Sequence, residues 1–91
     1  MSLFDEIGRA VMEGDEYKAA ELCQAMLAES FDPVEIISQG LLPGMDAVEA
    51  DYRGGVKYIP EILMSARAIL KAMDQIANYL GDRGLPKLDK V

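Results

Sequence analysis

Apolar residues recur every three or four positions in four stretches of the chain, the spacing of one face of an α-helix. The first stretch starts after Ser2 and ends at Gly14, and the second runs from Asp15 to about Ser30. Ser2 and Asp15 have side-chain oxygens that can cap the free amides of a helix start. No stretch shows the alternation typical of strands. The pattern predicts an all-α fold of four helices.

The third and fourth helices are predicted from the residues that start and end helices. Asp32 caps the third, and Pro33 occupies the first helical position, where its missing amide costs nothing. Glycines and a proline over residues 40–44 predict an interruption, so the third helix is expected to be kinked. After a glycine pair and a short extended link, Pro60 opens a fourth helix that ends near Leu80. The helical unit is predicted over residues 1–81.

The fourth helix carries two apolar stripes when its residues are placed at about 100° intervals. We expect the stripe with the longer side chains to close the bundle: Ile62, Leu63, Ala66, Ile69, Leu70, Met73, Ile76, Ala77 and Leu80. The other stripe has small or soft side chains: Met64, Ser65, Ala68 and Ala72. It could form a shallow surface for something flat. About equally, its small residues could let another helix approach closely, and Tyr58, just before the helix, could pack onto the core.

Composition limits the classes of partner. The chain has 91 residues, enough for one domain, and a formal net charge of -7, which repels nucleic acid and anionic membrane surfaces. No apolar run approaches the roughly 20 residues that span a bilayer, and no secretion signal precedes the first helix. Cys23 is the single cysteine, so an internal disulfide is impossible. A cytoplasmic protein is therefore expected.

Histidine is absent from the sequence. The usual nitrogen ligands of zinc, cobalt and iron and the commonest general base near neutral pH are therefore missing. Asp46, Glu49 and Asp51 lie close together, but nothing accompanies them that would make a nucleophile or a metal cluster. No catalytic residue and no metal ligand is predicted, and the chain is not expected to be an enzyme by itself.

A series of short motifs resembles the helical cap that precedes the cobalamin-binding domain in cobalamin-dependent methionine synthases and in corrinoid proteins of methyltransferase systems. The order and spacing of the motifs carry the resemblance, which covers most of the chain. They are Glu13-Gly14-Asp15, Asp32-Pro33-Val34-Glu35-Ile36-Ile37, Gly40-Leu41-Leu42-Pro43-Gly44-Met45, Val48, Tyr52, Gly55, Tyr58-Ile59-Pro60-Glu61 and Ser65-Ala66.

The resemblance implies an up-and-down four-helix bundle. This bundle would be a non-catalytic module that covers the upper, methyl-carrying face of cobalamin while a methyl group passes from a small methylated substrate. Tyr58 matches the aromatic position that touches the methyl group, and Ser65 and Ala68 lie on the stretch that faces the ring. Together with Met64 and Ala72, they form the predicted cofactor surface. The implied cofactor is a corrinoid such as methylcobalamin, held only together with an α/β domain.

The sequence also departs from that family. The Asp-x-His-x-x-Gly loop that ligates cobalt belongs to a following α/β domain, and this chain contains neither. Residues 82–91 are predicted to be a linker toward such a domain. The chain is therefore expected to be either a fragment that ends before that domain or a free-standing cap, and the linker favours the fragment. Glu49 stands where many relatives have glycine, and Tyr52 and Tyr58 stand where phenylalanine is usual. The expected partners are the cobalamin-binding α/β domain and cognate methyltransferase proteins.

A second hypothesis needs no cofactor. A methionine-rich, shallow helix face suits adaptable protein contacts. The same surface could therefore make the chain a helical interaction or dimerisation domain, with a homodimer formed through the uncovered cap face. The two hypotheses differ in what covers that surface.

Overall fold

The computed structural model describes residues 2–82, and all of its regular elements are helices. They are α1 (Leu3–Glu13), α2 (Glu16–Ala28), α3 (Pro33–Ile36), the π-helical turn η1 (Ile37–Leu41), α4 (Leu42–Arg53) and α5 (Ile59–Asp82). Because α3, η1 and α4 follow one another without a gap, the chain forms four helical rods. The prediction of an all-α fold is confirmed for the described residues.

Local side-chain chemistry begins the first three helices where the sequence predicts. The Asp5 amide donates to Ser2 Oγ over 3.2 Å, and the Ser2 amide donates to the Asp5 carboxylate, which completes a capping box. Asp15 and Asp32 cap the next two helices with their carboxylates, each of which accepts from one backbone amide without a reciprocal bond. Gly14 ends α1 in the left-handed conformation, with φ of 70°.

The interruption predicted over residues 40–44 is wrong, because the backbone stays helical there and widens into one π-helical turn. The glycines serve an interhelical contact instead. A Cβ atom on Gly40 would lie 2.6 Å from Ile7 Cγ2, and one on Gly44 would lie 2.7 Å from the Gly8 carbonyl oxygen. Both positions therefore let α1 cross η1 and α4 closely. The kink stays a prediction.

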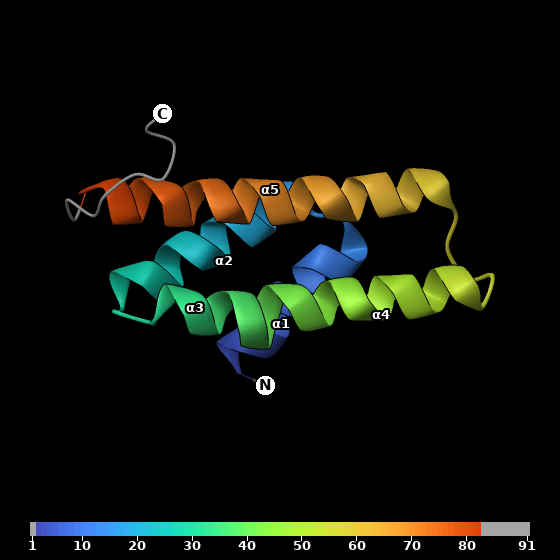
Figure 1. The fold of residues 1–91 in the computed structure, drawn as a ribbon, viewed down its shortest axis with the longest axis horizontal. Helices are drawn as coiled ribbons and strands as arrows, with labels where there is room; N and C mark the ends of the chain where they lie inside the picture. The colour runs from blue at the N-terminus through green and yellow to red at the C-terminus, as the bar shows by residue number, and fades with distance from the viewer. Residues whose placement is uncertain (1, 83–91) are drawn as a thin grey trace, which may run out of the picture.

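The two longest rods lie side by side and run in opposite directions, with α1 and α2 on one side of them (Figure 1). α5 packs mainly against α2, and α1 packs against η1 and α4. The core is centred where these pairs meet: Ile7, Ala10, Val11, Ala19, Cys23, Met26, Leu27, Ile36, Leu41, Ala68, Ala72 and Ile76. The up-and-down order of all four helices stays a prediction. The linker predicted over 82–91 begins at a residue that α5 includes, and its other positions lie outside the described residues.

Candidate functional site

The stripe of small residues on α5 faces the inside of the bundle. Ser65, Ala68 and Ala72 each have a relative exposure of 0%. The Cys23 thiol on α2 donates to the Ala72 carbonyl oxygen over 3.4 Å, which shows how closely the two helices approach. The prediction that these three residues form an exposed surface for a flat ligand is therefore wrong in this structure. Met64 is half exposed, beside the turn at Gly14.

The longer apolar side chains of α5 are divided between the surface and the core. Leu63 is 60% exposed and Leu70 is 64% exposed, although both were expected to close the bundle, whereas Ile76 from the same predicted stripe is buried. Small side chains allow helix backbones to approach closely, so the small stripe packs inside. Ile69 and Leu80 of the bulkier stripe also pack against the core, and its other side is left outward. Hydrophobic spacing alone does not distinguish these two arrangements.

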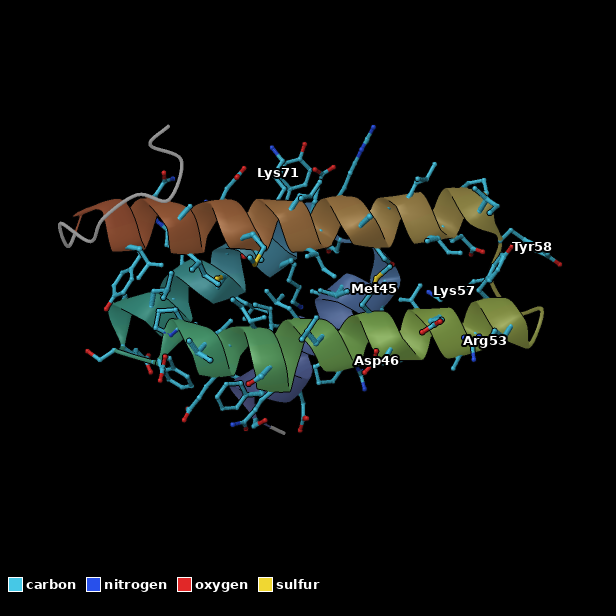
Figure 2. All side chains as sticks on the ribbon, viewed as in Figure 1. Met45, Asp46, Arg53, Lys57, Tyr58 and Lys71 are labelled. Atoms are coloured by element: carbon cyan, nitrogen blue, oxygen red, sulfur yellow. The ribbon has the colours of Figure 1, made fainter. Side chains whose placement is uncertain are left out.

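A second apolar surface lies at the end of the molecule where α4 leads into α5. We call it the end patch and define it by four residues: Tyr52, Val56, Tyr58 and Ile59, which are 45%, 67%, 67% and 55% exposed. Figure 2 shows the Tyr58 side chain projecting from the connecting loop away from the bundle. Tyr58 was among the predicted site residues, and the other three were not. The sequence feature that could have revealed them is a group of four large apolar residues within eight positions, which the predicted helix faces do not include.

Backbone contacts hold the loop that carries the end patch. The amides of Val56 and Lys57 donate to the Asp51 carbonyl oxygen over 2.8 and 3.2 Å. Gly55 adopts a φ of 80°, which a residue with a side chain rarely accepts. The Tyr58 amide donates to Glu61 Oε1 over 2.8 Å, half of a capping box at the start of α5. Tyr58 is therefore presented from a fixed backbone.

Lys57 ties the same loop to the first helix. Its half-buried ammonium donates to the carbonyl oxygen of Met12, in the last turn of α1. Carbonyl groups at a helix C-terminus lack intrahelical partners and carry partial negative charge, so a cation is favoured there. The contact joins residues 45 positions apart in the sequence. It fixes the end patch relative to the rest of the bundle.

Comparison with known proteins places the chain in a family. The sequence profile of the family described as the B12 binding domain matches residues 3–77. The chain belongs to the B12 binding domain family.

Several corrinoid proteins are similar to this chain over most of its length. A corrinoid protein of Desulfitobacterium hafniense (strain Y51) is 32% identical over 85 residues, covering 93% of this chain and 39% of the relative. The methanol corrinoid protein of Methanosarcina barkeri is 35% identical over 68 residues, covering 75% of this chain and 26% of the relative. The structure of the Methanosarcina barkeri monomethylamine corrinoid protein superposes with a TM-score of 0.82 at 29% identity, covering 86% of this chain and 37% of that one. The chain thus spans between about a quarter and two fifths of these proteins.

The chemistry available in the described part of this B12 binding domain is contact rather than ligation. Residues 2–82 contain no group of three or more His, Cys, Asp or Glu side chains that could hold a metal ion. Burial raises the pKa of the Cys23 thiol to about 11, so the thiol stays protonated and is a poor ligand near neutral pH. Glu49, one of the three clustered acids, pairs with Arg53 over 2.8 Å on the exposed face of α4. No helix of the described residues is long and apolar enough to cross a membrane.

Proposed function

We propose that this chain is the helical cap of a corrinoid methyl carrier and that its end patch covers the upper face of cobalamin, where the methyl group is carried. The observation that carries the proposal is the end patch itself. In a B12 binding domain, four large apolar side chains are exposed where α4 leads into α5: one at the end of α4, two on the loop and one at the start of α5. Two amide contacts to the Asp51 carbonyl oxygen, a helix cap and Lys57 hold the loop in place. An exposed apolar surface of this kind indicates a contact that the chain does not make with itself.

The residues of the end patch fit the face of a flat, largely apolar macrocycle. The aromatic rings of Tyr52 and Tyr58 offer broad surfaces, and Val56 and Ile59 extend them with aliphatic side chains. When bound, the corrinoid would supply the cobalt chemistry that accepts and donates a methyl group. The end patch would exclude water from that face, and the phenol groups would keep a polar edge toward solvent.

A cobalt ligand must come from elsewhere in the protein, because the sequence has no histidine. We therefore assign the corrinoid to a site shared with a cobalamin-binding α/β domain, with cognate methyltransferases as the partners that deliver and remove the methyl group. The relatives named as methanol and monomethylamine corrinoid proteins support a small methylated substrate. In this assignment the chain is a carrier module and the methyltransferases are the catalysts.

A protection assay tests the proposal. The chain is joined to the α/β half of the monomethylamine corrinoid protein, loaded with methylcobalamin, and the loss of the methyl group in light is followed by visible absorption. We expect Val56→Asp to accelerate the loss several-fold toward the rate of the α/β half alone, because a charged group on the covering surface is costly to desolvate.

Val34→Asp is the matched control, because Val34 lies on α3, outside the end patch, and is 68% exposed against 67% for Val56. Its rate should equal that of the unmodified protein. Equal rates for both variants, in fusions that bind the corrinoid and retain their circular dichroism, would overturn the assignment of the end patch. A cofactor-free interaction domain predicts that result together with no protection by the unmodified chain.

A further inference from the structure

The exposed side of α5 carries a further apolar surface, which is separate from the end patch and to which the proposed function gives no role. We call it the α5 seam and define it by five residues: Leu63, Ala66, Leu70, Met73 and Ala77. Leu63, Leu70 and Met73 are 60%, 64% and 37% exposed. The buried residues of α5 lie on a different side of the helix, which packs against α2. The seam therefore has no occupant among residues 2–82.

The spacing of the seam indicates a helix as its occupant. Its members follow one another at intervals of three, four, three and four residues. This is an average of 3.5, the repeat that keeps a stripe of side chains facing one partner helix along its length. A stripe that only covers a bundle core is wider, and α5 meets that need with a separate set of buried residues.

We propose that the partner is α5 of a second copy of this chain, paired in the antiparallel direction. In the central register, Leu63 of each copy meets Met73 of the other, and Ala66 meets Leu70. Each small side chain of these two layers thus faces a large one, so the seam is complementary to itself about a two-fold axis. Pairing in the same direction would place Ala66 against Ala66 and leave a gap beside two opposed leucines.

The charged residues beside the seam also favour antiparallel pairing. Arg67 and Asp74 flank one side of the seam, both are exposed, and neither joins an ion pair within the described residues. Antiparallel pairing brings Arg67 of one copy toward Asp74 of the other, because helix side chains lean toward the N-terminus. Parallel pairing would instead put the two charged flanks on opposite sides of the seam, so that Arg67 and Asp74 could not meet. The two opposite charges therefore favour the antiparallel dimer.

The proposed dimer leaves most of the end patch free, because only Ile59, which would meet Ala77 of the other copy in this register, lies at the pairing contact. Tyr52, Val56 and Tyr58 lie outside the seam, on α4 and on the loop before α5. The pairing therefore leaves the greater part of the end patch available. A seam of two heptads is short for a protein interface, so we expect a dissociation constant on the order of 10 µM.

Sedimentation equilibrium of the 91-residue chain between low and high micromolar concentration tests the proposal. We expect a monomer–dimer equilibrium, and Leu70→Glu should weaken it at least about tenfold, since it places two charges at the centre of the seam. Asn78→Glu is the matched control: it adds the same charge on the same helix, at an exposed position of the polar side. Leu63→Glu repeats the test should Leu70→Glu lower the melting temperature.

Two further results fix the orientation. Arg67→Asp and Asp74→Arg should each weaken the dimer about two- to fourfold, and the double variant should restore it. A mixture of Ala66→Cys and Leu70→Cys chains should form the mixed disulfide in preference to either homodimer. A monomer at every concentration, equal weakening by Asn78→Glu, or preferred Ala66→Cys homodimers would each overturn the proposal. The protection assay reads a different surface, so the failure of one proposal is separable from failure of the other.

Discussion

The stripe of small residues on α5 and the end patch illustrate two opposite uses of apolar residues in one short chain. Ser65, Ala68 and Ala72 have little side-chain surface and are completely buried, whereas Tyr58 and Val56 are large and two-thirds exposed. Small side chains at a helix contact maximise the approach of backbones, and large exposed ones are available for contact with another molecule. Small residues therefore mark the closest contact of α5 within the bundle, whereas large apolar residues occur both in the core, as Ile7 and Met26 do, and in the end patch.

The largest effect is expected from a charge introduced into the buried stripe of α5. Ala68→Glu should destabilise the fold by more than about 3 kcal/mol, because Ala68 is 0% exposed and a carboxylate there would have neither room nor a partner. Urea unfolding followed by circular dichroism measures the effect. If Ala68 instead lay on an outer surface that receives a ligand, the variant would fold like the unmodified chain.

The matched control is Leu63→Glu, five residues earlier on the same helix and 60% exposed. Measured at low concentration, where α5 is unpaired, it should change the stability by no more than about 0.5 kcal/mol. Equal losses for both variants would contradict the arrangement of α5 described here.

The contact between Lys57 and α1 sharpens the comparison, because it decides how firmly the end patch is presented. Lys57→Met removes the ammonium that donates to the Met12 carbonyl oxygen while keeping most of the aliphatic stem. We expect a loss of about 1–2 kcal/mol and faster hydrogen exchange of the Tyr58 amide, which lies next to the lost contact. Lys57→Arg should restore part of both.

Lys71→Met serves as the control for charge, since Lys71 is exposed on α5 and points away from the bundle (Figure 2). Unchanged exchange at Tyr58 in the Lys57→Met variant would show that the loop is held by its own backbone contacts alone. If Lys57→Met lowers the stability but leaves hydrogen exchange of the Tyr58 amide unchanged, Lys57 stabilises the fold without holding the end patch.

The predictions that held were those that depend on local chemistry. Ser2, Asp15 and Asp32 were expected to cap helices and do so, because a capping side chain bonds to amides only two or three residues away. The helix before the end patch was likewise expected to stop at Gly54, where α4 does end. Such signals are complete within a few residues of sequence.

The predictions that failed required knowledge of the opposite helix. Gly40 and Gly44 have the composition of a helix break, yet they are needed where α1 crosses, and only the position of α1 decides between the two. Ser65 and Ala68 were weighed equally as a contact between helices and as a ligand surface, and the position of α2 decides that choice. The predicted cofactor surface is therefore exposed at Tyr58 and buried at Ser65 and Ala68, and the contact of Tyr58 with a corrinoid stays a prediction.

Ser65 offers the finest test of the buried stripe. Its hydroxyl is completely buried and has no hydrogen-bond partner within the described residues. An unsatisfied buried polar atom costs free energy, so Ser65→Ala should raise the free energy of unfolding by about 1 kcal/mol. Ser38→Ala, at an exposed position of η1, controls for the gain in helix propensity and should contribute about 0.5 kcal/mol or less. Destabilisation by Ser65→Ala would instead show that the hydroxyl bonds within the folded protein, so that the stripe holds a polar contact as well as close packing.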